Sequence, residues 1–359
     1  MDKLWKKYRL NRINIRSGKL IGLVVLGVIL VLVPWLVHSP YYMHLLIMVG
    51  IYAVLAMTFI FLLRTGLITL AIAAFWGIGA YSSALLTMRL DLSFWLALPL
   101  SAIITGIIGF CIGYIFVRSP GFAFIILTAS LGMAIVHVFG TFDVFGGYLG
   151  ITGIPAPDPI LLPFLAPIKF SRVDKTAYYY LMLFLVLLVV LALRAFYSAW
   201  TGRAWRAIGL SPRLAESLGV NLFRYRLLAF VIASAAAGLM GSFYAHYMQS
   251  LVPGAFVVIK TIYAHIYAIL GGIGFAISGP VIGAFIMTIV PELLRVVREF
   301  EPIFTGLFLI LLVLFLPNGL LGLLSLRQRV ERPSESIARV GRWIRDYLPT
   351  SRSEHENRK

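Results

Sequence analysis

Apolar runs of about 20 residues, the length that a helix needs to cross the hydrocarbon core of a bilayer, recur along most of this chain. Hydrophobic residues make up 60% of its 359 residues and charged residues only 13%, whereas soluble domains are about one quarter charged. We therefore predict an all-α integral membrane protein, a bundle of about ten transmembrane helices with interrupted helices among them. The ten candidate spans are residues 20–38, 42–63, 66–88, 93–117, 122–141, 177–198, 226–249, 256–274, 278–296 and 301–317.

The charged residues indicate which side of the membrane each span end faces. Lysine and arginine outnumber aspartate and glutamate by 31 to 14, for a formal net charge of +17. They occur in an N-terminal arm, a central loop and a C-terminal tail, not on one soluble face, which argues against nucleic-acid binding. Arg64 and Arg118 end the second and fourth spans on the side of the central loop. By the positive-inside rule we expect this side, and both termini, to be cytoplasmic.

These patterns divide the chain into three parts. Residues 1–19 are expected to form a basic cytoplasmic arm, residues 20–326 the transmembrane domain and residues 327–359 a basic cytoplasmic tail. Within the domain, five prolines forbid a continuous helix in the outer segment 143–175, and a cytoplasmic loop covers 199–225. The first span is too long for a signal-peptide core, so we expect it to be retained. The tail fits either an interfacial helix or a disordered basic segment.

No residue pattern indicates catalysis. The sequence has no Gly-x-x-x-x-Gly-Lys-Ser/Thr loop for a nucleotide, and its histidines lie on different spans without a paired ligand motif. We therefore expect no enzyme activity, cofactor or metal. The single cysteine, Cys111, excludes an intramolecular disulfide and is predicted to be a small core residue. His137, His246 and His265 are predicted to be hydrogen-bonded interior residues.

Glycine and proline interrupt several apolar runs, most clearly at residues 65–66 and 271–274. Backbone that is not helical at membrane depth is tolerated only beside protein or a water-filled cavity, so these breaks indicate a transport pathway. Lys260 is the clearest ionisable residue within a span, and it either faces this pathway or snorkels to the outer boundary. A scaffold without transport stays an alternative, as does an ion-coupled secondary transporter. The near absence of carboxylates within the spans argues against the latter.

The central loop also carries a family motif. Residues 203–209 (RAWRAIG) and 215–221 (AESLGVN) resemble the EAA-type cytoplasmic loop of ABC importer permeases, and more narrowly the branched-chain amino acid permease family of the LivM type. The chain resembles this family, in the same order, in four further patches: residues 66–81, 146–155, 270–295 and 317–322.

The resemblance implies a permease subunit of an ABC importer that moves branched-chain amino acids, or a related small polar solute, inward by alternating access. It implies a second homologous permease subunit, two cytoplasmic ABC ATPase subunits and an extracytoplasmic substrate-binding protein as partners, in the lipid bilayer of a bacterial or archaeal cytoplasmic (inner) membrane. A short loop helix would sit in a groove of the ATPase, with turns at Gly209 and Gly219. The residues implied in ATPase coupling are Arg203, Arg206, Ala207, Gly209, Arg213, Glu216 and Gly219.

The resemblance also implies a translocation pathway, in which this chain departs from its family. Met133 and Tyr263 stand where the family commonly carries acidic residues, so the pathway offers fewer polar contacts to a zwitterionic amino acid. Lys260 instead favours an anionic or neutral solute. The residues implied in the pathway are Phe75, Tyr81, Met133, Lys260, Tyr263, Gly272 and Gly274.

Overall fold

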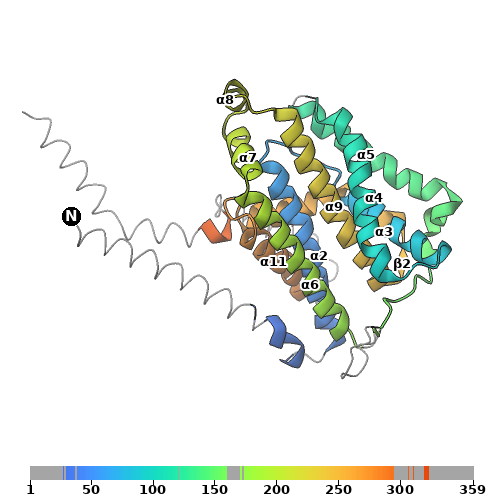
Figure 1. Cartoon of the computed structure of the whole chain (residues 1–359). Helices are drawn as coiled ribbons and strands as arrows, with labels where there is room; N and C mark the ends of the chain where they lie inside the picture. Colours follow the sequence, from blue (N-terminus) through green and yellow to red (C-terminus); the bar gives the residue numbers. More distant parts are fainter. Residues whose placement is uncertain are drawn as a thin grey trace, which may run out of the picture.

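The computed structural model describes residues 27, 30–36, 39–119, 121–159, 170–171, 174–294, 306, 310 and 319–322. The described part is a bundle of α-helices, as predicted (Figure 1). Its long helices are α2 (Pro40–Leu63), α3 (Ile72–Arg89), α4 (Phe94–Phe116), α5 (Gly121–Thr141), α6 (Thr176–Ser198), α9 (Leu222–Met248), α10 (Val258–Gly271) and α11 (Ser278–Leu294). Its shorter elements are η1 (Asp143–Phe145), η2 (Gly147–Leu149), β1 (Ile151–Thr152), α7 (Trp200–Leu210), α8 (Pro212–Ser217), β2 (Ser250–Leu251) and η3 (Pro253–Phe256).

Six helical segments of the described part are long and apolar enough to cross a membrane, which fits a multi-pass membrane protein. They are α2, α4, α5, α6, α9 and the segment Pro253–Gly271, in which η3 leads into α10, while α11 is a shorter apolar helix. The expected spans 20–38 and 301–317 lie largely outside the described residues, as do the basic arm and tail. The count of ten helices and the cytoplasmic position of both termini therefore stay predictions.

The structure corrects the boundaries of two predicted spans. Helix α3 begins at Ile72 and not at residue 66, because Gly66 has a φ of +76° and the chain is not helical before Ile72. Helix α10 ends at Gly271 and not at residue 274, because Gly272 has a φ of +117°. Glycine adopts a positive φ at little cost, so both glycines permit a break that other residues would resist.

Helix α9 runs through the middle of the bundle, with α2 and α6 on one side and α3 and α4 on the other (Figure 1). It approaches α3 so closely that only glycine fits at the contact. A Cβ atom at Gly79 would overlap the backbone of Gly238, and a Cβ atom at Gly241 would overlap the carbonyl oxygen of Trp76. Small residues permit this approach, and the resulting van der Waals contact holds helices together in a membrane.

At the end of the bundle opposite α7 and α8, extended chain is fastened to the helices. Strand β1 pairs antiparallel with β2, with Ile151 opposite Leu251. His246 of α9 is fully buried, and its Nδ1 donates a hydrogen bond to the carbonyl oxygen of Pro155 at 2.8 Å. In the neutral ring Nε2 then accepts from the hydroxyl of Ser83 at 3.0 Å. The prediction that His246 is a hydrogen-bonded interior residue is confirmed.

Of the other three residues expected in the interior, two are exposed. Cys111 is exposed, because Gly113 belongs to the face of α4 that packs on α9 and Cys111, two residues earlier, lies on the opposite face. His137 is exposed on α5, where its Nδ1 lies 3.0 Å from the hydroxyl of Tyr148. His265 is partly buried in α10 and forms a hydrogen bond with the backbone of Thr69, as predicted, while its buried Nε2 has no hydrogen-bond partner among the described residues.

The contact of α9 with α3 predicts the effect of adding one methyl group. Gly79→Ala is expected to destabilise the protein by about 1–3 kcal/mol, because overpacking forces the two backbones apart. The measurement is the Tm of the purified protein in detergent. Gly254→Ala is the matched control, since a Cβ atom at Gly254 would meet nothing within 4 Å. Equal Tm values for the two variants would contradict the proposed packing.

Candidate functional site

Helices α7 and α8 project from one end of the bundle, between α6 and α9 (Figure 1). Helix α7 is amphipathic, and its buried face consists of Gly202, Trp205 and Ile208 at three-residue spacing. The indole Nε1 of Trp205 donates to the carbonyl oxygen of Tyr225 at 2.8 Å, and its ring meets that of Phe61 edge to face at 4.8 Å. Trp205 therefore anchors α7 against the first turn of α9 and the last turn of α2.

The opposite face combines basic and apolar side chains. Arg203, Arg206, Arg213 and Glu216, four of the residues implied in coupling, are all exposed. Between them lie three leucines that the sequence reading missed: Leu210, Leu214 and Leu218 are 89%, 66% and 81% exposed. Helical periodicity within the loop could have found them, since the arginines and leucines lie away from Trp205. We call this set of seven residues the α7–α8 surface.

The two glycines of the loop have different roles. Gly219 follows α8 with a φ of +83°, which confirms the predicted turn. The prediction of a turn at Gly209 is wrong, because Gly209 lies within α7. A Cβ atom there would overlap the carbonyl oxygen of Arg64, so close approach of two backbones requires this glycine. Ala207, the remaining residue implied in coupling, is half-buried on α7.

Arg64 connects α7 to the ends of two other helices. Its carbonyl oxygen faces Gly209, and its guanidinium donates from Nη2 to the carbonyl oxygen of Gly274 at 3.1 Å. The guanidinium also lies 5.1 Å from the ring centroid of Tyr197 in α6, within cation–π range. Arg64 thus joins α7 to α6 and to the break after α10.

Arg226 of α9 fastens the same turn from the other side. Its Nε donates to the carbonyl oxygen of Thr65 at 3.2 Å, and a Cβ atom at Gly66 would lie 3.3 Å from its Nη2. Residues 64–66, which we call the 64–66 turn, are therefore held by α7, α9 and the end of α10 together. The sequence predicted a helix break at this turn and used Arg64 to assign the orientation in the membrane. It did not predict that the turn connects three helices and so forms a joint between them.

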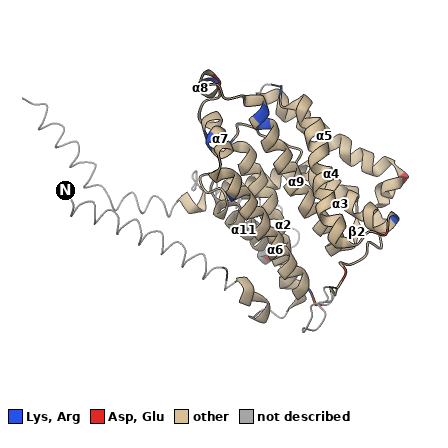
Figure 2. Cartoon of the chain, in the orientation of Figure 1, with Lys and Arg blue, Asp and Glu red and all other residues tan. Residues whose placement is uncertain are grey.

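Charge is segregated between the two ends of the bundle (Figure 2). Four described acidic residues, Asp91, Asp143, Asp158 and Asp174, lie in the connections at the end opposite α7 and α8, where Arg89 and Lys175 also lie, whereas Glu216 lies on α8. The arginines that gather at the end carrying α7 and α8 are Arg64, Arg118, Arg194, Arg203, Arg206, Arg213, Arg224 and Arg226.

Two of the residues implied in the pathway, Phe75 and Tyr81, are buried in α3. The ring of Phe75 lies 5.3 Å from that of Phe230, and the ring of Tyr81 stacks on that of Phe139 at 4.2 Å. Neither faces an open surface in this structure. The hydroxyl of Tyr81 and Nε1 of Trp76 are also buried, and neither has a hydrogen-bond partner within the described ranges.

A second group lies on the outside of α5 and α10. Met133 is 60% exposed and Tyr263 is 40% exposed. Lys260 is half-buried, and its Nζ lies 5.8 Å from the ring centroid of Tyr263. Helices α5 and α10 touch near this group, where a Cβ atom at Gly132 would lie 2.8 Å from Cγ2 of Val258.

The pathway residues therefore do not form one cluster. Gly272 and Gly274 follow α10 beside the 64–66 turn, whereas Lys260 and Tyr263 lie near its start. The described residues also contain no group of three His, Cys, Asp or Glu side chains that could hold a metal ion. Among the described residues the arrangement offers one exposed surface of arginines and leucines, one contact point between helices and one exposed helical face.

Comparisons with known proteins agree with this reading. A family model described as the branched-chain amino acid transport system / permease component matches residues 41–316. The LivM permease protein of the high-affinity branched-chain amino acid transport system of Salmonella typhimurium is 29% identical over 275 residues, which cover 72% of this chain and 64% of the relative. LivM of Escherichia coli K12 is 28% identical over the same shares.

The LivH permease protein of Escherichia coli K12 is 34% identical over 125 residues, which cover 34% of this chain and 39% of LivH. No solved structure matches the chain significantly. The chain thus aligns with somewhat less than two thirds of the LivM relatives, 64% of their length. Because the family match extends over residues 41–316, well over half of the chain, this protein belongs to the permease component family of branched-chain amino acid transport systems.

Proposed function

We propose that this chain is the membrane-spanning permease subunit of an ABC importer for branched-chain amino acids or a related small polar solute. The observation that carries this proposal is the α7–α8 surface, which exposes three leucines among arginines on helices that project from a bundle. Exposed apolar patches with a polar rim are typical of protein interfaces. Membership in the permease family and the names of the LivM relatives support the solute class.

The segregation of charge supports a position for each end of the bundle. By the positive-inside rule, the arginine-rich end that carries α7 and α8 faces the cytoplasm. We assign the chain to the cytoplasmic membrane of a bacterium or an archaeon, as in the species of the relatives. The α7–α8 surface then meets a cytoplasmic ATPase subunit, and the end with β1 and β2 faces the extracytoplasmic binding protein.

The 64–66 turn supplies a route from ATPase to pathway. If ATP binding moves the docked α7, the contact of Gly209 with Arg64 carries that displacement into the turn. The hydrogen bond from Arg64 to Gly274 then displaces the glycine break after α10. Glycines absorb such changes of φ and ψ easily, so a rigid-body shift of α7 is converted into a hinge motion of α10 and α11.

The exposed face of α5 and α10 suggests where the solute passes. Met133 and Tyr263 are too exposed to belong to this chain's own core, so we place a second, homologous permease subunit opposite them, with the pathway between the two. The unpartnered polar atoms of Trp76 and Tyr81 support a motion of α3 during transport. A buried polar group without a partner costs about 1–3 kcal/mol, and a state that admits water or solute would recover this energy.

The proposal as a whole is tested by uptake of leucine into proteoliposomes. With the second permease, the ATPases and the binding protein present, we expect uptake that requires ATP. Omitting the ATPase subunits is expected to abolish it, because this chain has no nucleotide-binding loop of its own. Uptake that persists without ATPases and collapses when ion gradients are dissipated would indicate an ion-coupled secondary transporter instead.

The docking surface is tested by a charge placed in its apolar part. Leu210→Glu is expected to weaken binding of the ATPase roughly 30-fold, as for a hot-spot residue in an interface. The measurement is the amount of ATPase that co-purifies with the permease across a concentration series. Leu149→Glu is the control, because Leu149 is 90% exposed in η2 at the opposite end of the bundle. Equal losses for both variants would point to general instability and contradict the assignment.

The joint is tested by removing the guanidinium of Arg64. Arg64→Met is expected to lower ATP-driven uptake roughly tenfold, which is within the range of typical coupling free energies. Binding of the ATPase should be unchanged, because the guanidinium of Arg64 contacts Gly274 and Tyr197 and is not part of the α7–α8 surface. Arg194→Met serves as the control, because Arg194 lies near the end of α6 at the same end of the bundle as Arg64. This variant should transport normally. Normal uptake by Arg64→Met would show that this side chain does not couple the movement of α7 to the break after α10.

A further inference from the structure

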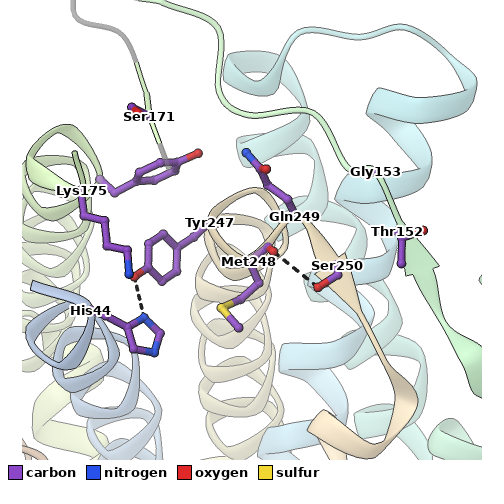
Figure 3. A pocket seen from close by; sticks show the side chains of 10 residues that line it. His44, Thr152, Gly153, Ser171, Lys175, Tyr247, Met248, Gln249 and Ser250 are labelled. Carbon is purple, nitrogen blue, oxygen red and sulfur yellow. Dashed lines mark hydrogen bonds between the residues drawn. The ribbon is translucent and has the colours of Figure 1, made fainter. Parts of the chain in front are cut away.

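At the end of the bundle opposite α7 and α8, a pocket of about 550 Å³ opens among α2, α6, α9 and the strands β1 and β2 (Figure 3). Its size is within the range of small-molecule sites, which span about 300–1,000 Å³. The pocket takes no part in the coupling route or in the pathway residues described above. The polar side chains that line it are those of His44, Thr152, Ser171, Lys175, Tyr178, Tyr247, Gln249 and Ser250.

Three of these side chains converge from three helix ends (Figure 3). His44 comes from the first turn of α2, and its Nδ1 lies 2.6 Å from the hydroxyl of Tyr247 in the last turn of α9. The two rings stack at 5.7 Å, so each holds the other in place. Lys175, immediately before α6, interacts electrostatically with His44. The result is a preformed wall of two rings beside an ammonium group.

The charge of this wall is not balanced within the pocket. No acidic residue is among the described residues that line it. The nearest carboxylate in sequence, Asp174, accepts a hydrogen bond from the backbone N–H of Thr176 at 3.0 Å. Hydrogen bonds from Thr176 hold the pKa of Asp174 below its ordinary value, so this carboxylate is engaged at the start of α6. Lys175 is therefore the one charged side chain among the described residues that line the pocket, and its ammonium group can attract an anion.

Gln249 adds a polar group whose position costs backbone energy. It is the residue between α9 and β2, and its φ of +56° lies in the left-handed region that glycine favours. For other residues this conformation costs about 1–2 kcal/mol, and it persists only where the surroundings enforce it. Here the pairing of β1 with β2 and the hydrogen bond from the N–H of Gln249 to Ala245 at 2.8 Å enforce it. The enforced turn directs the amide side chain to the pocket rim (Figure 3).

We propose that this pocket binds a small carboxylate, with Lys175 as its counter-ion and Gln249 and Tyr247 as hydrogen-bonding neighbours. Met248 and the His44–Tyr247 ring pair provide apolar surface for a short aliphatic side chain. A carboxylate fits better than a phosphate dianion, because a single lysine and neutral donors match one negative charge. The proposal rests on the proposed function only where it takes the carboxylate to be that of the transported solute at the extracytoplasmic face.

The test is direct binding to the full chain in lipid nanodiscs, without ATP or partner proteins, followed by saturation-transfer NMR. The probe is isovalerate, and isovaleramide is its neutral isostere. We expect saturable binding of isovalerate but not of isovaleramide. Lys175→Met should weaken isovalerate binding roughly tenfold or more, as expected for loss of a hydrogen bond to a charged group. Lys175→Arg should restore most of the affinity.

Two further variants separate binding from folding. Gln249→Gly suits the positive φ and should fold at least as well as the native chain, yet bind isovalerate more weakly. Arg89→Met removes a cation at the same end of the bundle but outside the pocket, and should bind normally. Equal binding of the two probes, or an unchanged affinity in Lys175→Met, would overturn the proposal.

The pocket would instead be a contact for a soluble protein if isovalerate failed to bind and Lys175→Met weakened only the docking of the binding protein. That result also overturns the proposal. Neither outcome touches the ABC importer assignment, because ATP-dependent uptake is measured separately in the complete transporter.

Discussion

The glycine contact between α9 and α3 is the constraint on which the other features of this structure depend. Gly79 and Gly238 bring two helix backbones together more closely than any side chain would allow. In a bilayer, where lipid is as apolar as leucine, this dense van der Waals contact replaces the hydrophobic effect as the force between helices. This contact holds α9 in place at the centre of the bundle. The two ends of α9 can then contact different parts of the chain.

Each end of α9 is bound to polar chain by specific hydrogen bonds. At one end Tyr225 accepts from Trp205 of α7, and Arg226 donates to Thr65 of the 64–66 turn. At the other end His246 holds Pro155, and Gln249 leads into the β1–β2 pair. A rigid helix that is fastened at both ends moves as one body. A displacement at the end with α7 can therefore reach the end with β1 and β2 without a chain of flexible contacts.

The two proposed sites differ in the way that their tasks require. The α7–α8 surface lies on projecting helices and mixes exposed leucine with arginine, which suits a protein partner with a complementary groove. The pocket with Lys175 is concave, has one lysine and no acidic residue among its described lining residues, and is braced by the His44–Tyr247 ring pair, which suits a small anion. Between them the glycine break after α10 stays deformable, and Arg64 ties that break to the first of the two sites.

Much of this could be predicted from local sequence. Apolar runs of membrane length predicted the helical class, and the motif around residues 203–221 predicted which loop projects from the bundle. Helix breaks at Gly66 and Gly272 were visible because glycine punctuates a helix through its own backbone freedom, a local property. The observed helices begin or end several residues away from the predicted span ends. A glycine therefore indicates that a helix is interrupted more reliably than it indicates where the helix begins or ends.

Contacts between residues far apart in the chain could not be predicted in this way. Gly209 was predicted to be a turn residue. Glycine is required there because the backbone of Arg64, which is remote in sequence, packs against it. Phe75 and Met133 looked alike as apolar pathway candidates, yet packing buries the first in the core and leaves the second on the surface. The sequence by itself determined that the chain is an α-helical membrane protein with one projecting basic loop, because hydropathy and charge act locally. Only the tertiary structure decided which faces meet, which arginine becomes a joint and which lysine lines a pocket, because those depend on helix packing across the bundle.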